Sequence, residues 1–176
     1  MCQFENLKMK KYILLILSIL LTISLWNCEK DDICEKGTPT TPRMIVEFYD
    51  NLNPISKKNV TNLGIVANGM TTGILYNGVS KITVPLQTNT DITKYSFIYD
   101  SQNTNVSLQN EDKITINYTR NDVFISRACG YKTLFTLLDN PNGIVKTIDT
   151  DNWIKEIVIQ KYKILNEDEV HVKIFF

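Results

Sequence analysis

Histidine, alanine and tryptophan are the residue types that this sequence uses least. The chain has 176 residues but two alanines, Ala67 and Ala128, and one histidine, His171. Alanine is the best helix former, so its scarcity beside 22 Ile, 11 Val and 18 Thr disfavours a helical bundle. β-branched side chains pack well on a pleated surface, and the composition therefore predicts an all-β fold.

An excess of charge of one sign is also missing. The chain has 19 basic and 19 acidic residues. Without the first 27 residues, which we interpret below as a signal peptide, it carries 16 positive and 18 negative charges. This balance offers no basic surface for a phosphate backbone, so we exclude nucleic acid as a partner.

Common catalytic and cofactor motifs are absent. The chain has no G-x-S-x-G elbow, no H-E-x-x-H pair and no phosphate-binding G-x-x-x-x-G-K-[ST] loop. His171 is expected to point outward from the last strand, as an exposed side chain. Glu47 is the one acidic residue flanked by apolar residues inside an expected strand, whereas a glycosidase needs two carboxylates. We expect no enzyme, no cofactor and no metal, with a hydrolase as the least favoured alternative.

A short hydrophobic run lies near the N-terminus. Lys10 and Lys11 precede residues 12–26, which are apolar or aromatic apart from Ser18, Thr22 and Ser24. A membrane-spanning helix needs about 20 apolar residues, so this run is more typical of a signal peptide. We predict a signal over residues 1–27, with Met9 as an alternative start.

Cys28 ends this run and is the predicted lipidation site. Leu25, three positions before it, supplies the apolar residue that a lipoprotein signal requires, although Asn27 departs from the usual small residue. Several acyl chains on Cys28 would anchor the mature chain, because each buried CH₂ contributes about 0.8 kcal/mol. The alternative is a secreted protein with Cys28 in a disulfide.

Lys30, Asp31 and Asp32 follow this cysteine. The segment resembles the export signal of Bacteroidota surface lipoproteins, in which a lysine and two acidic residues follow the lipidated cysteine. The resemblance implies an outer-membrane lipoprotein that faces the medium. The alternative is an acidic spacer, with the domain facing the periplasm.

Longer stretches resemble a family of small Bacteroidota lipoproteins known only as a domain of unknown function. The matching stretches are Cys28-Glu-Lys-Asp-Asp-Ile-Cys34, Thr38-Pro-Thr-Thr-Pro-Arg43 and Ser126-Arg-Ala-Cys-Gly-Tyr131. The resemblance covers most of the mature chain. It implies no catalytic or binding residues.

Two cysteines, Cys34 and Cys129, remain if Cys28 is acylated and Cys2 is removed. Exported proteins meet oxidising conditions, so we predict a disulfide between them. Because six extended residues reach about 20 Å, the bridge would hold the domain near the bilayer. The alternatives are free thiols or a metal site with His171, which lacks the usual ligand spacing.

Residues 28–42 are expected to be a lipidated tether and spacer, and residues 43–176 one domain. In the domain, short apolar runs alternate with turn residues, which predicts an antiparallel β-sandwich of about nine or ten strands. Immunoglobulin-like topology is one version, and a closed β-barrel is the alternative. We expect the clearest hairpin to turn at residues 120–122, a short strand at 105–109, and one strand over 153–164.

Trp153 is the one tryptophan after the signal, and we expect it to belong to the core; the alternative is a ligand-binding surface. Aromatic faces stack on sugars, and Asp151 and Asn152 beside it could hold hydroxyl groups. This interpretation requires an exposed Trp153, or an exposed face at Tyr95 and Tyr99. The oxygen-rich loop 149–152 lacks the glycine and distal Glu of an EF-hand, so we expect it to be solvated rather than to bind Ca²⁺.

These observations favour a non-catalytic interaction or accessory module. Its expected partners are the membrane, through the N-terminal lipid, and a protein or glycan at the cell surface. A lipoprotein that binds carbohydrate or another small ligand is the alternative.

Overall fold

The computed structural model describes residues 11–20, which are helical, and residues 33–176. In these parts of the chain no helix is both long enough and apolar enough to cross a membrane. Contacts divide the chain into two compact units. Of the described residues, the first contains 11–20, 33–38 and 126–130, and the second contains 39–125 and 131–176.

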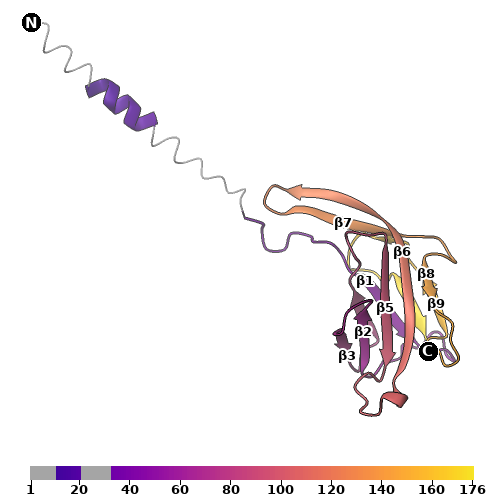
Figure 1. Ribbon diagram of the computed structural model, residues 1–176. Helices are drawn as coiled ribbons and strands as arrows, with labels where there is room; N and C mark the ends of the chain where they lie inside the picture. Colours follow the sequence, from indigo (N-terminus) through magenta and orange to yellow (C-terminus); the bar gives the residue numbers. More distant parts are fainter. Residues whose placement is uncertain (1–10, 21–32) are drawn as a thin grey trace, which may run out of the picture. The chain divides into compact units, whose positions relative to one another are not determined.

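The second unit is an all-β sandwich, as the composition predicts (Figure 1). Residues 33–176 contain eleven strands: β1 (Met44–Tyr49), β2 (Leu63–Ala67), β3 (Ile74–Tyr76), β4 (Lys81–Val84), β5 (Ile92–Tyr99), β6 (Asn110–Ser126), β7 (Gly130–Leu137), β8 (Ile144–Lys146), β9 (Glu156–Ile159), β10 (Lys163–Ile164) and β11 (Val172–Phe175). One sheet has the order β4-β1-β11-β9, and the other β10-β7-β6-β5-β2-β3 with β8 paired to β6. Neither described sheet closes into a barrel.

The sandwich differs from the antiparallel prediction at one strand pair. β1 and β11 run parallel, with Val46 opposite Val172 and Phe48 opposite Ile174. These strands lie at opposite ends of the domain sequence, so no tight turn has to join them and parallel pairing is allowed. β1 is buried on both faces, which explains its nearly continuous apolar sequence.

The core lies between the two sheets. Its largest fully buried apolar side chains include Phe48 from the first sheet and Phe97, Tyr118 and Phe135 from the second. Alternation along each strand brings these side chains to the inner faces, while polar neighbours point outward. The core therefore follows from the period-2 pattern of the sequence.

The predicted hairpin at residues 120–122 is wrong. β6 continues through these residues for 17 positions, and the chain reverses only after Ser126, before Gly130 at φ +69°. A tight hairpin needs positive φ angles, and no residue of the segment 119–122 adopts one. The alternation of side chains continues instead through Tyr118, Arg120, Asp122 and Phe124.

Two further strand predictions are corrected. Residues 106–108 form a 3₁₀ helix, because the Asn105 side chain accepts a hydrogen bond from the Ser107 amide and caps it. The segment 153–164 contains two short strands, β9 and β10, rather than one. Between them Gln160 and Lys161 both donate their amides to the His171 carbonyl, which ends β9.

Candidate functional site

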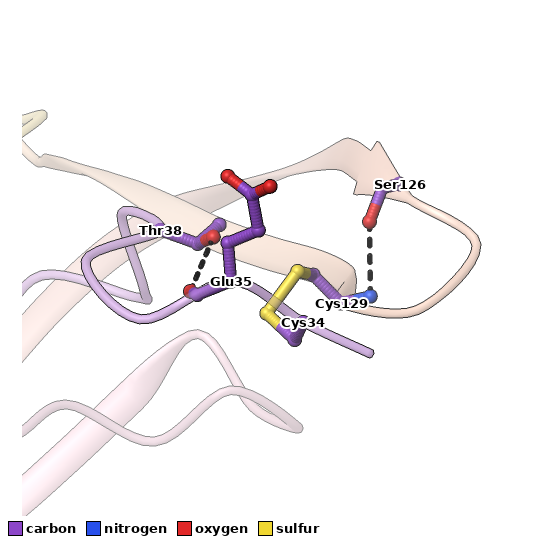
Figure 2. Close-up of a disulfide and its surroundings, with 5 residues drawn as sticks. All are labelled: Cys34, Glu35, Thr38, Ser126 and Cys129. Carbon is purple, nitrogen blue, oxygen red and sulfur yellow. Dashed lines mark hydrogen bonds between the residues drawn. A yellow bond between two sulfur atoms is a disulfide. The ribbon is translucent and has the colours of Figure 1, made fainter. Parts of the chain in front are cut away.

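A disulfide joins Cys34 to Cys129 in the first unit (Figure 2). The two residues are 95 positions apart in the chain, and their Cα atoms are 4.8 Å apart. The Cys129 amide donates a hydrogen bond to Ser126 Oγ at 3.0 Å, which stabilises the turn that carries this cysteine. The predicted pairing is confirmed, and the chain-entropy model assigns a loop of this length about 4–5 kcal/mol.

The end of the predicted spacer is fixed in the second unit. Thr41 Oγ1 accepts a hydrogen bond from the Thr133 amide at 3.0 Å. Two residues later, Arg43 donates from Nε and Nη2 to the two carboxylate oxygens of Glu167, at 2.9 and 2.7 Å. These hydrogen bonds lower the pKa of Glu167 to about 2, so the pair stays charged across the ordinary pH range.

β6 and β7 continue as a two-stranded ribbon beyond the end of β5 (Figure 1). β5 pairs with β6 over the residues from Asn110 to Asn117. The Tyr118 amide then donates to the Asp91 carbonyl, just before β5 begins. In the described sheet order, β7 is the neighbour of β6 along the rest of its length. We call residues 119–125 and 131–134 the ribbon.

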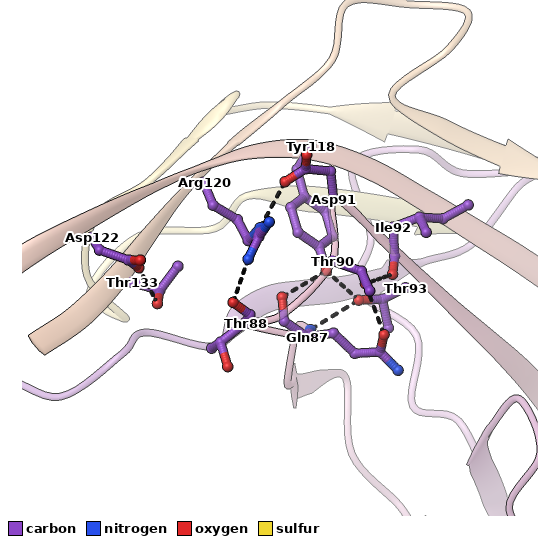
Figure 3. Close-up of polar contacts among 10 residues, drawn as sticks. All are labelled: Gln87, Thr88, Thr90, Asp91, Ile92, Thr93, Tyr118, Arg120, Asp122 and Thr133. Atoms are coloured by element: carbon purple, nitrogen blue, oxygen red, sulfur yellow. Dashed lines mark hydrogen bonds and ion pairs between the residues drawn. The ribbon is translucent and has the colours of Figure 1, made fainter.

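Tyr118 fixes the base of the ribbon (Figure 3). Its hydroxyl lies 2.5 Å from Thr93 Oγ1 and donates to the Gln87 carbonyl at 2.9 Å. The Gln87 amide donates in turn to Thr93 Oγ1, which completes a ring of three hydrogen bonds. Burial raises the pKa of Tyr118, so the hydroxyl keeps the proton that this ring requires.

Charged residues extend the same network along the ribbon (Figure 3). Arg120 donates from Nε to Asp91 at 2.6 Å and from Nη1 to the Thr88 carbonyl at 2.5 Å. Thr133 Oγ1 donates to Asp122 at 2.6 Å, which links the two ribbon strands. Both arms of the ribbon are thus held by side chains as well as by their pairing.

An aromatic pair, Phe124 and Tyr131, lies on the ribbon. The ring centroids are 5.3 Å apart in an edge-to-face arrangement. Tyr118 and Phe135 form a similar pair within the core, at 5.2 Å. Phe124 and Tyr131 continue the same strand faces but remain 55% and 69% exposed. Sequence reasoning missed them because the hairpin expected at 120–122 interrupted the alternation that points to them.

The buried Glu47 of the first sheet forms an ion pair with the half-exposed Lys57. Its carboxylate accepts hydrogen bonds from Lys57 Nζ at 2.8 Å and from the Tyr49 hydroxyl at 3.0 Å. Burial alone would raise the pKa of Glu47, but the hydrogen bonds from Lys57 and Tyr49 outweigh it and the pKa is lowered. A general acid needs a raised pKa, so this geometry is that of a structural ion pair.

His171 is buried, which corrects the prediction of an exposed side chain. Its Nδ1 accepts a hydrogen bond from the Ile45 amide at 2.9 Å, whereas Nε2 has no hydrogen-bond partner among the described residues. Burial lowers the pKa of His171, so the imidazole is neutral. In residues 11–20 and 33–176, no three His, Cys, Asp or Glu side chains are grouped to hold a metal ion.

Trp153 belongs to the core, as expected from the sequence, and the alternative of an exposed stacking surface at this residue is wrong. The residue is 8% exposed, and its ring packs against Phe48, Tyr99 and Phe176. Its indole Nε1 donates to the Phe97 carbonyl at 3.0 Å. The size of the ring favours this burial, and the carbonyl satisfies its polar atom.

The neighbours of Trp153 have structural contacts as well. Asn152 Nδ2 donates to the buried Asp112 at 2.9 Å, and the Asp151 carbonyl accepts from Asn110 Nδ2 at 2.5 Å. Tyr95 and Tyr99 are half-buried. None of Trp153, Tyr95 and Tyr99 therefore presents the exposed ring that stacking on a sugar requires.

The predicted lipidation and export residues, Cys28, Lys30, Asp31 and Asp32, lie outside the described residues. Their roles remain predictions.

The comparisons with known proteins give one finding. A model of a family of unknown function, DUF6452, matches residues 62–176. This region contains ten of the eleven strands and Cys129, but it begins after Cys34. No curated protein and no solved structure matches the chain.

Proposed function

We propose that the chain, which belongs to the DUF6452 family of unknown function, is an exported lipoprotein of the Bacteroidota type, anchored through Cys28. The observation that carries this proposal is the disulfide between Cys34 and Cys129. Disulfides persist in oxidising compartments, which supports export. Pairing of these two cysteines also leaves Cys28, at the end of the hydrophobic run, free for acylation.

The proposed role is that of a non-catalytic interaction or accessory module at the outer membrane. The two residues closest to acid–base chemistry support it, because Glu47 is paired with Lys57 and His171 is buried and neutral. Both side chains have structural contacts within the first sheet. The rigid scaffold and its projecting ribbon suit a protein that holds or positions a partner.

The proposed orientation is toward the medium. Lys30, Asp31 and Asp32 follow the anchor directly and resemble a surface export signal. A domain displayed in this way would meet proteins and glycans of the cell surface.

Replacement of the anchor cysteine tests the proposal. The mature wild-type protein should fractionate with membranes, and its intact mass should include acyl chains on an N-terminal Cys28. Cys28→Ala should abolish both the acyl mass and the cleavage that precedes it. As a control, the double variant Cys34→Ser, Cys129→Ser should remain acylated and membrane-bound. Normal anchoring of Cys28→Ala, or a wild-type protein without acyl mass, would refute the proposal.

A further inference from the structure

We infer that Phe124 and Tyr131 insert into the headgroup region of the bilayer to which Cys28 is anchored, so that the ribbon is the membrane-facing end of the domain. This inference rests on the proposed acylation of Cys28. It names the lipid surface itself as the partner of the aromatic pair.

The two rings of the aromatic pair are exposed to solvent. Phe124 and Tyr131 are 55% and 69% exposed, and each has the other as its aromatic contact within the described residues. The equivalent faces of the same strands are covered nearer the core, where Tyr118 and Phe135 are buried. A paired, exposed phenylalanine and tyrosine on a rigid support indicate an interaction surface. Tyrosine is also typical of membrane interfaces, because its ring is apolar and its hydroxyl reaches water.

Covalent reach identifies the lipid surface as the partner. Cys34 comes six positions after Cys28, a distance of at most about 20 Å along the chain. The disulfide then brings Cys129 within 4.8 Å of Cys34, measured between Cα atoms. Tyr131 follows two residues later, which adds at most roughly 7 Å. An acylated Cys28 therefore keeps Tyr131 within roughly 30 Å of the bilayer surface.

A positive charge near the turn, that of Arg127, suits contact with the phosphates of a lipid surface. Arg127 is exposed, and in the described part of the chain it forms no salt bridge. Its position is three residues after Phe124 and four before Tyr131. A guanidinium group donates readily to phosphate oxygens, such as those of lipid headgroups.

The chain also supplies a matched control at the other end of β6. Leu108 is 61% exposed, in the 3₁₀ helix that precedes β6. The length of β6 places it roughly 50 Å along the strand from the turn that follows Ser126. Leu108 and Tyr131 are thus comparably exposed, but the covalent path from the anchor to Tyr131 is much the shorter of the two.

Tryptophan probes test the inference. The mature variants Tyr131→Trp and Leu108→Trp are isolated with their acyl chains and placed in phosphatidylethanolamine–phosphatidylglycerol vesicles with brominated acyl chains. Bromine quenches tryptophan on contact, and the wild-type signal of Trp153 is subtracted. We expect at least about twofold stronger quenching of Tyr131→Trp than of Leu108→Trp, because an interfacial ring sits at headgroup depth. A Phe124→Trp variant should behave like Tyr131→Trp.

The disulfide provides a further arm of the experiment. In the background Cys34→Ser, Cys129→Ser, quenching of Tyr131→Trp should fall toward that of Leu108→Trp, because the short covalent path is lost. Equal quenching of the two probes in the disulfide-bonded protein overturns the inference. So does an emission that is insensitive to bromine but changes with protein concentration, which would assign the aromatic pair to a second copy of the chain.

Intact mass distinguishes the two proposals. Acyl chains on Cys28 without quenching of Tyr131→Trp would overturn membrane insertion and leave the lipoprotein assignment in place. Absence of acyl chains from Cys28 would overturn both.

Discussion

The indole Nε1 of Trp153 donates a hydrogen bond to the Phe97 carbonyl at 3.0 Å, inside the core. This contact fixes Trp153 among the rings of Phe48, Tyr99 and Phe176. It satisfies the one polar atom of a side chain that is otherwise apolar.

The first prediction concerns the fluorescence of this residue. In the mature protein, Trp153 emission should be blue-shifted and resistant to acrylamide, because the ring is shielded from water. The exposed probe Leu108→Trp provides the control, since it should add a red-shifted component that acrylamide quenches. A red-shifted, easily quenched signal from the wild type would contradict burial and restore Trp153 as a candidate ligand-binding residue.

The second prediction concerns the disulfide. The variant Cys34→Ser, Cys129→Ser should lower the free energy of unfolding by about 2–5 kcal/mol, because the unfolded chain regains the freedom that the cross-link removes. Urea denaturation of wild type and variant, each with and without reductant, measures the difference. Reductant should shift the midpoint of the wild type alone. An unchanged wild-type midpoint under full reduction would contradict this expectation.

Strand β1 and the disulfide show what the sequence is able to predict. The apolar residues around Glu47 predicted a strand there, which is β1, and the compartment implied by the signal peptide predicted the pairing of Cys34 with Cys129. The prediction of the strand depends on a local pattern, and the prediction of the disulfide depends on elimination among four cysteines. The parallel pairing of β1 with β11 depends on contacts more than 120 residues apart, such as Val46 with Val172, which no local pattern encodes.

His171 and Phe124 show where the prediction failed. The sequence predicted an exposed His171, because its position alternates with the apolar residues of the last strand. The neighbouring strand β1 buries this side chain, and the Ile45 amide donates a hydrogen bond to it. For Phe124, polar residues at 120–122 resembled a turn, whereas Arg120 and Asp122 are bound by Asp91 and Thr133 within a continuous strand. In both cases the deciding partners are distant in the sequence.

The third prediction concerns acid sensitivity. The pKa of His171 is lowered in the folded protein by burial, while Glu169 and Glu167 oppose this shift and Lys81 adds to it. The unfolded chain therefore binds more protons below about pH 6.5, so the contribution of His171 to stability is complete above that pH and is lost as the pH falls. The loss is at most about 1.4 kcal/mol per pH unit.

Urea denaturation between pH 7.5 and pH 5 measures this effect. The matched variant is His171→Asn, whose side-chain oxygen can replace Nδ1 as an acceptor but does not titrate. We expect a flatter pH dependence for His171→Asn than for the wild type. Parallel curves for the two proteins would show that His171 is not the group responsible.

The fourth prediction concerns the ion pair between Glu47 and Lys57. Glu47→Gln should lower the free energy of unfolding by about 1–3 kcal/mol, because it removes a buried, charged acceptor for Lys57 and Tyr49. Lys57→Met leaves the Glu47 carboxylate buried without its cation, so it should destabilise the fold more than the combined variant does. A double-mutant cycle measures this coupling. Additive effects of the two substitutions would contradict a direct interaction.

The last prediction concerns the side of the membrane on which the domain lies. Replacing Lys30, Asp31 and Asp32 with Ala removes the proposed export signal without altering Cys28 or the folded domain. On intact cells, added protease or antibody should reach the wild-type domain, and this access should disappear in the triple variant while acylation persists. The double variant Glu35→Ala, Lys36→Ala is the matched control, because it changes nearby charges but leaves the proposed signal intact. If the wild-type domain is protected, the orientation proposed here is wrong and the aromatic pair would face the periplasmic side of the bilayer.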